Sequence, residues 1–167
     1  HEQLLGYHVL QADETPVKVS KDGRPANANS YMWVYRTGKY YKNTPIILYD
    51  YQKTRSAEHP ERFLKGFEGL VVTDAHSAYG KLDRKIEELS FSACWAHARR
   101  RFAEALKALP KAKRENASDT IAVQALTRIA AIYHLDNELS DLSPEKRCAK
   151  RKLMIQPLVE AYFSWLK

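Results

Sequence analysis

From Trp95 onward the hydrophobic period of this chain is helical, and this change limits the fold more than any other feature. Before Trp95, apolar residues form short runs bounded by Gly, Pro and Asn, which is typical of strands. After it, apolar residues recur at three- and four-residue steps, as on one face of a helix: Trp95, Ala98, Phe102, Ala105 and Leu109. The sequence therefore predicts a sheet that is followed by helices.

Five strands are predicted before this point. They cover residues 7–12, 31–36, 46–49, 70–73 and 89–93. Short turns join the first three strands, which indicates an antiparallel meander, whereas helices near residues 56–67 and 78–82 precede the last two. Thr15-Pro16 should end the first strand, because proline cannot donate a hydrogen bond to a ladder. The fold class predicted is α/β, with a mixed sheet made of a three-stranded antiparallel meander and two further strands.

The C-terminal part is predicted to be entirely helical. A second long helix repeats the apolar stripe, with Ala122, Leu126, Ile129 and Tyr133 on one face. Ser143-Pro144 begins a third helix, with serine as the N-cap and proline in the first turn. Pro157 should break or kink this helix, because it removes a backbone hydrogen bond and clashes with the preceding turn.

Charge, cysteine content and hydropathy exclude several classes of protein. The net charge is +7, and residues 76–167 hold 17 of the 27 basic residues but 11 of the 20 acidic ones. This asymmetry favours a polyanionic partner such as nucleic acid, and a solvated helix face is the alternative.

Two cysteines do not indicate a disulfide framework, and no apolar run reaches the ~18 residues of a membrane span. Because residue 1 is His and the only methionines are Met32 and Met154, we expect a fragment or a processed chain. The low cysteine content favours a reduced, cytoplasmic setting.

Two aspartates directly follow predicted strands. Asp13 follows the first strand and Asp74 the fourth. If these strands are neighbours, both carboxylates project from the same edge of the sheet, where sites in α/β proteins tend to lie. Two carboxylates there can hold Mg²⁺, which prefers oxygen ligands, and two such ions about 3.5–4 Å apart can stabilise both oxygens of a phosphodiester displacement. The alternative is that each aspartate caps a turn.

A series of motifs runs along the chain in one order. The motifs are Ala12-Asp13-Glu14-Thr15-Pro16, Tyr31-Met32-Trp33-Val34-Tyr35, Tyr49-Asp50-Tyr51 with Arg55-Ser56, Phe67-Glu68-Gly69, Val72-Thr73-Asp74-Ala75 with Tyr79, and Cys94-Trp95-Ala96-His97-Ala98-Arg99-Arg100-Arg101-Phe102. Over about residues 7–109 the series resembles the transposases of the insertion-sequence-66 family, with a looser match in the helices that follow. Each motif alone is weak, but their joint order and spacing are specific.

The resemblance implies a ribonuclease-H-like fold and a transposase that uses an Asp-Asp-Glu triad with two divalent ions, Mg²⁺ or Mn²⁺. Asp13 matches the first member of the triad and Asp74 the second. In the family the glutamate lies beyond a helical insertion, and this sequence stops before the expected motif. Residues 1–109 would then form an incomplete catalytic core and residues 110–167 the helical insertion, so we expect the fragment to be inactive alone.

The last motif adds a histidine and three arginines to the candidate site. The resemblance implies a catalytic His97, near the scissile phosphate or hydrogen-bonded to an acidic residue, and a packed histidine is the alternative. Zinc binding by Cys94 and His97 is disfavoured, because no second ligand pair lies nearby in the sequence. Arg99, Arg100 and Arg101 span most of a helical turn. They are candidates for DNA phosphate contacts, which supply affinity rather than sequence readout.

We therefore expect a DNA transposase that cleaves transposon ends and joins them to target DNA in the bacterial cytoplasm, associated with the nucleoid. DNA is the expected partner, no membrane is, and assembly into an oligomer on DNA is left open. Two alternatives are retained: a catalytically inactive nucleic-acid-binding remnant of the same fold, and a nuclease for RNA–DNA hybrids. His76 and Tyr79 follow Asp74 closely and are expected to line the site.

Overall fold

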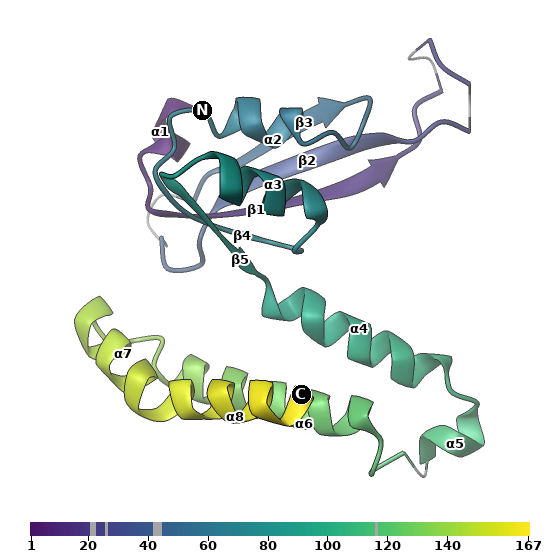
Figure 1. The fold of residues 1–167 in the computed structure, drawn as a ribbon, viewed down its shortest axis with the longest axis vertical. Coiled ribbons are helices and arrows are strands. Elements are labelled where there is room, and N and C mark those ends of the chain that lie inside the picture. The colour runs from purple at the N-terminus through teal and green to yellow at the C-terminus, as the bar shows by residue number, and fades with distance from the viewer. Residues whose placement is uncertain (21–22, 26, 42–44, 116) are drawn as a thin grey trace. The chain divides into compact units, whose positions relative to one another are not determined.

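The chain folds into two compact units, His1–Cys94 and Trp95–Lys167. The computed structural model describes residues 1–20, 23–25, 27–41, 45–115 and 117–167, and Figure 1 shows the elements in chain order. The division falls where the hydrophobic period was predicted to change. The predicted boundary between catalytic core and insertion, at residues 109 and 110, stays a prediction, because a division into compact units does not show where an insertion begins.

The first unit is built on a five-stranded mixed sheet. The strands are β1 (Val9–Val17), β2 (Ser30–Thr37), β3 (Ile47–Gln52), β4 (Gly69–Thr73) and β5 (Leu89–Ala93). Their order across the sheet is β3-β2-β1-β4-β5. The first three strands pair antiparallel as a meander, and β4 pairs parallel with both β1 and β5. The predicted α/β class, the meander and the two further strands are confirmed.

Strand β1 is longer than predicted, because Pro16 does not end it. Pro16 pairs with Tyr31 of β2, and the strand continues to Val17. The reason is that β4 pairs with β1 only at Val9–Gln11, so the second half of β1 has a neighbour on one side alone. A proline is tolerated in such an edge-like stretch, where its missing N–H deprives no partner. The prediction that Thr15-Pro16 interrupts the strand was wrong.

One face of the sheet carries the core of this unit. Leu10, Trp33 and Val71 are fully buried on three adjacent strands. Three helices supply the covering side chains: α1 (Glu2–Leu5), α2 (Glu58–Phe63) and α3 (Ser77–Lys85). Leu4, Leu64 and Tyr79 from these helices and their ends complete the cluster. Within β1, burial alternates with a period of two, as expected for a strand with one covered face.

Gly69 fixes the approach of β4 to β1. Its φ is +147°, and a Cβ at this position would lie 2.5 Å from the carbonyl oxygen of His8. Leu70 also donates its N–H to that oxygen at 3.0 Å. The strand pair that carries Asp13 and Asp74 therefore requires glycine at its start.

We predict that Gly69→Ala lowers the free energy of unfolding of this unit by about 2 to 3 kcal/mol, through backbone strain and a clash that only a backbone shift can relieve. Gly66→Ala is the matched control. Gly66 also has a positive φ, +84°, but a Cβ there would meet nothing within 4 Å. Its replacement should cost about 1 kcal/mol. Urea unfolding of both variants measures the difference, and equal losses would contradict the close approach at Gly69.

The second unit is helical throughout its described length. Its elements are α4 (Trp95–Ala108), α5 (Lys111–Glu115), α6 (Ile121–Glu138), α7 (Pro144–Lys150), the π-helical turn η1 (Arg151–Ile155) and α8 (Gln156–Leu166). Ala125, Ile129 and Tyr162 form a buried cluster against which Trp95, Phe102 and Trp165 pack. The predicted stripes are thus confirmed in part: Trp95 and Phe102 of α4 and Ile129 and Tyr133 of α6 share this core. Ala105 is exposed, and the buried face of α6 is formed by Ala125, Ile129 and Ile132.

Pro157 was predicted to break or kink this helix, and the structure has a disruption directly before it, although the helical path does not stop there. The helix passes from α7 through η1 into α8, with Pro157 in the first turn of α8. Proline in a helix interior clashes with the carbonyl four residues earlier, here that of Leu153, which lies inside η1. A π-helical turn accommodates such a misfit by widening the hydrogen-bonded ring. Across the described part of the chain, the helices are too short or too polar to cross a membrane.

Candidate active site

Asp13 and Asp74 occupy matching positions on neighbouring parallel strands. The register pairs Gln11 of β1 with Val72 of β4. Each aspartate lies two residues beyond its member of this pair, so their backbones are level at the edge where the pairing ends. Strands in a sheet lie about 4.8 Å apart. The condition that these strands are neighbours is thus met, although Asp13 lies within β1 and not at its end.

A tight turn after β4 fixes the backbone of Asp74. The Asp74 Oδ1 atom accepts the N–H of His76 at 2.8 Å, and the Thr73 Oγ1 atom accepts that of Ala75 at 3.2 Å. Ala75 has a φ of +63°. Asp74 therefore does cap a turn, as the alternative interpretation predicts. The bond uses Oδ1, and the other carboxylate oxygen, Oδ2, has a different partner.

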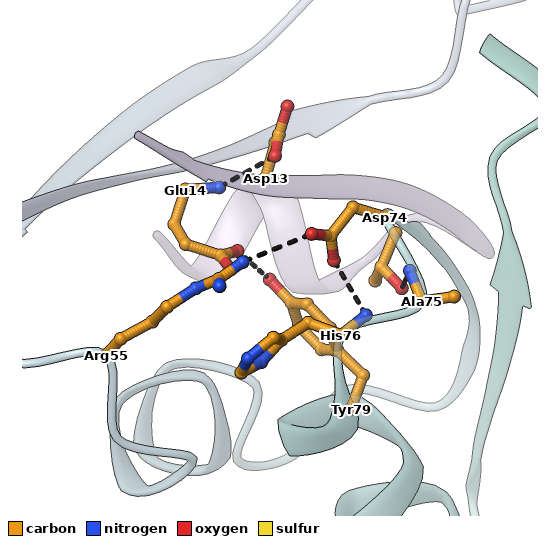
Figure 2. A network of polar contacts seen from close by, with 8 residues as sticks. Asp13, Glu14, Arg55, Asp74, Ala75, His76 and Tyr79 are labelled. Atoms are coloured by element: carbon orange, nitrogen blue, oxygen red, sulfur yellow. Dashed lines mark hydrogen bonds and ion pairs between the residues drawn. The ribbon is translucent and has the colours of Figure 1, made fainter. Parts of the chain in front are cut away.

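That partner is Arg55, which also binds a buried glutamate. Figure 2 shows Arg55 between Glu14 and Asp74. Its Nη2 atom lies 3.2 Å from Asp74 Oδ2 and 2.5 Å from Glu14 Oε1, and its Nε donates to the same Glu14 oxygen at 2.6 Å. The Tyr79 hydroxyl donates to Glu14 Oε2 at 2.9 Å. Glu14, Arg55, Asp74 and Tyr79 thus form one network, which we call the Arg55 network.

Burial fixes the protonation state of the tyrosine. Burial, the negative charge of Glu14 and their hydrogen bond all raise the pKa of Tyr79 far above its usual value. Its hydroxyl therefore keeps its proton and acts as a donor. Burial by itself would lower the pKa of Arg55, but its hydrogen bond to Glu14 and the nearby carboxylates raise it. The Glu14 side chain is fully buried, so these two partners compensate a charge that would otherwise be very costly.

The side chains of Asp13 and Asp74 lie on different sides of β1. Glu14 follows Leu10 and Ala12 on the covered face, whereas Asp13 is half-buried on the other face, because successive strand residues alternate. In Figure 2 the Asp13 carboxylate points away from the Arg55 network, and its Oδ1 accepts the N–H of Glu14 at 2.9 Å. The described residues include no group of three or more His, Cys, Asp or Glu side chains that could hold a metal ion. The register makes the two backbone positions level, whereas the two side chains turn to different sides of β1.

The remaining candidates divide between the two units. His76 joins the site through its backbone N–H, and Tyr79 through Glu14. His97, half-buried in the first turn of α4, belongs to the second unit. Arg99, Arg100 and Arg101 lie in the same helix and are all exposed. The catalytic role of His97 and the DNA-binding role of the three arginines stay predictions.

Cys94 and Cys148 are free cysteines, and Cys94 donates its N–H to the Thr73 carbonyl at 2.7 Å.

Sequence reasoning missed Glu14 and Arg55 as members of the site. Both stood inside quoted motifs, but neither was given a role. The signal for Glu14 was present: it continues the apolar alternation of Leu10 and Ala12 onto the buried face. A carboxylate at such a position requires a cation or several donors. The identity of the cation was not accessible in this way, because Arg55 is 41 residues away in the chain.

One family model matches the whole chain, and three relatives match most of it or part of it. A family model described as "Transposase IS66 family" matches residues 1–167. Three relatives from Sinorhizobium fredii (strain NBRC 101917 / NGR234) are titled uncharacterized proteins. Protein y4hP is 28% identical over 167 residues, which cover 94% of this chain and 30% of the relative. Protein y4qI is 30% identical over 118 residues, which cover 60% of this chain and 22% of the relative. Protein y4jD is 26% identical over 156 residues, which cover 89% of this chain and 29% of the relative. The chain thus spans less than a third of the length of these relatives, and no solved structure matches it.

Proposed function

Because the chain belongs to the IS66 family of transposases, we propose that it forms part of the catalytic region of a DNA transposase that cleaves transposon ends and joins them to target DNA. The observation that carries the proposal is the placement of Asp13 and Asp74 at level positions on neighbouring parallel strands. Asp13 lies in β1 beyond its last pair with β4, and Asp74 directly follows β4, so both are at the carboxyl end of the parallel pairing, where ligand sites in α/β sheets tend to lie. Family membership without this geometry would support the transposase relationship but not a site.

We further propose that the fold of the first unit is ribonuclease-H-like. The support is the strand order β3-β2-β1-β4-β5, with an antiparallel meander on one side and two parallel strands on the other. This is the order that the family resemblance implies. In such a fold the acidic residues lie on the first strand and after the fourth, which are the positions of Asp13 and Asp74.

The two aspartates fit a divalent metal ion by their chemistry. Mg²⁺ takes oxygen ligands, and proteins commonly hold it with one or two carboxylates, with water and substrate phosphate completing the sphere. Asp13 and Asp74 would be these carboxylates. Bound Mg²⁺ or Mn²⁺ would stabilise the charge that develops on the phosphodiester oxygens during displacement. No residue of this chain is assigned the third carboxylate.

The helical unit would supply DNA affinity in this proposal. The three exposed arginines of α4 carry positive charge on adjacent positions, and residues 76–167 hold most of the basic residues. Contacts from Arg99, Arg100 and Arg101 to phosphates would bind DNA without reading its sequence. His97 is proposed to act beside the scissile phosphate. Because its substrate is DNA, the protein would act at the bacterial nucleoid in the cytoplasm. Assembly into an oligomer on paired transposon ends is compatible with this proposal.

The test uses a full-length protein that contains this chain, and linear DNA that carries the transposon ends. We expect strand cleavage with Mg²⁺ or Mn²⁺ and none with EDTA. Cleavage that persists in EDTA would refute the metal-dependent mechanism. Preferential cleavage of an RNA–DNA hybrid, independent of end sequence, would indicate the nuclease alternative. DNA binding without cleavage under all conditions would indicate the inactive remnant.

The 167-residue chain by itself should not cut DNA. The described residues contain no preformed group of three metal ligands, and two-metal catalysis needs ions fixed on both sides of the scissile bond. We expect salt-sensitive DNA binding through the basic helical unit, with affinity that falls as ionic strength rises. A gel-shift assay and a nicking assay on the same DNA measure both properties. Strand transfer by the isolated chain would contradict this prediction.

A further inference from the structure

In the Arg55 network, Arg55 pairs with two carboxylates that differ in burial: Glu14 is fully buried, and Asp74 is partly exposed. We infer that Arg55 is a positioning residue for Asp74: it holds Asp74 in the metal-free chain, and a divalent cation binds by displacing Arg55 from Asp74 while Arg55 stays on Glu14. The inference rests on the proposed role of Asp74 as a metal ligand. It adds that the guanidinium of Arg55, a group of the chain itself, competes with the metal ion for Asp74.

The contact of Arg55 with Asp74 is the weaker of its two ion pairs. It is a single contact of 3.2 Å, and the side chains of Arg55 and Asp74 are 35% and 19% exposed. Water and salt screen an ion pair of this kind. The contact with Glu14 consists of an ion-pair contact of 2.5 Å and a hydrogen bond of 2.6 Å, to a carboxylate with no exposed surface. Arg55 is therefore anchored at Glu14, and Asp74 is the end that can separate.

The direction of the side chains makes the same separation necessary. Asp13 lies on the opposite side of β1 from the Arg55 network, and Figure 2 shows the Asp74 carboxylate directed toward Arg55. Asp74 Oδ1 already accepts the His76 N–H, so Oδ2 is the oxygen that would leave Arg55 when Asp74 shares a cation with Asp13. Arg55 then stays bonded to Glu14, which is held in turn by the hydroxyl of Tyr79. The cation and the guanidinium thus compete for one oxygen, and binding of either weakens binding of the other.

Arg55→Lys separates this competition from simple charge repulsion. Lysine keeps the positive charge, but an ammonium lacks the planar fork that lets one guanidinium serve two carboxylates. We expect the ammonium of this variant to pair with the buried Glu14 and to release Asp74. Mn²⁺ should then bind the variant about two- to fivefold more tightly than the wild-type chain, the range that a half-exposed ion pair supports. Calorimetric titration of the folded 167-residue chain with Mn²⁺ measures the ratio.

Two controls accompany the titration. Arg62→Lys makes the same change at an arginine of α2 in the same unit, outside the Arg55 network, and should leave the affinity unchanged. Asp74→Asn should abolish the specific binding. Nuclear magnetic resonance with Mg²⁺ provides a second readout: the Arg55 Nε–H signal should persist, because its partner is Glu14, whereas the His76 amide signal should shift with Asp74.

Each outcome decides between the inference and the proposed function. Tighter Mn²⁺ binding by Arg55→Lys, with the Nε–H signal of the wild-type chain retained, supports displacement at Asp74. Binding that depends on Asp74 but is equal or weaker in Arg55→Lys overturns the inference alone. Loss of the Nε–H signal on Mg²⁺ binding also overturns it, since Arg55 would then leave Glu14. Absence of Asp74-dependent binding in both chains overturns the inference together with the metal-dependent part of the proposed function.

Discussion

Replacing Asp74 with asparagine in a full-length protein that contains this chain should lower the rate of transposon-end cleavage by about a thousandfold or more. A divalent ion contributes several kcal/mol to stabilisation of a phosphoryl transition state, and each 1.36 kcal/mol corresponds to about a tenfold change in rate. Asparagine keeps the oxygen that accepts the His76 N–H, so the turn after β4 should survive. What it loses is the negative charge that would bind the metal. Single-turnover cleavage of end DNA in Mg²⁺ measures the effect.

Asp83→Asn is the matched control for this experiment. Asp83 of α3 accepts the N–H of Phe91 at 3.0 Å, so it is another aspartate with a backbone partner in the same unit. Its replacement should leave cleavage within about twofold of the wild-type rate, as for a surface change away from the site. If folded Asp74→Asn cleaved within about tenfold of wild type, Asp74 would not be a metal ligand, and the nucleic-acid-binding remnant would become the better explanation.

The sequence predicted the order and type of most elements because each one carries its own periodicity. The meander, the strand at Leu89–Ala93 and the long helices α4 and α6 all follow from local patterns. The clear error occurred at Pro16, which lies inside the strand that it was expected to end. The deciding factor was tertiary: β4 pairs with β1 only near the start of β1, so the later part of β1 has one neighbouring strand. At Pro157 a disruption was predicted, and the structure has a π-helical turn directly before this proline. How far one strand pairs along another cannot be read from residues near a proline.

The candidate site was predictable in its backbone and not in its side chains. The sequence predicted that both aspartates follow strands, and the structure supplies the two facts that make their backbones level: β1 pairs with β4, and Gln11 is in register with Val72. The side on which Asp13 lies is set by its place in β1, whereas the orientation of Asp74 depends on Arg55, which comes from the segment between β3 and α2. A long-range ion pair leaves no periodic trace in the sequence. The alternation within β1 did indicate a buried carboxylate at Glu14, but only the fold shows that Asp74 shares its cation.

Removing the cation from the buried Glu14 should cost more stability than any other change described for the first unit. Arg55→Met leaves the Glu14 carboxylate fully buried with Tyr79 as its remaining donor in the Arg55 network. Breaking a buried ion pair at one partner costs about 3 to 5 kcal/mol, because the other charge stays without compensation. Glu14→Gln should cost less, since Arg55 is 35% exposed and can turn toward water. The cost therefore depends on which partner is removed.

Amide hydrogen exchange at β1 and β2 measures this loss in the first unit alone, since both strands lie within His1–Cys94. The double variant Glu14→Gln with Arg55→Met is the decisive comparison. A neutral glutamine can still accept from the Tyr79 hydroxyl, and no uncompensated charge remains, so the double variant should be more stable than Arg55→Met by about 2 kcal/mol or more. If the two were equally stable, Glu14 would not depend on Arg55 for its charge, and Arg55 would lack the anchor that lets it release Asp74 to a metal ion.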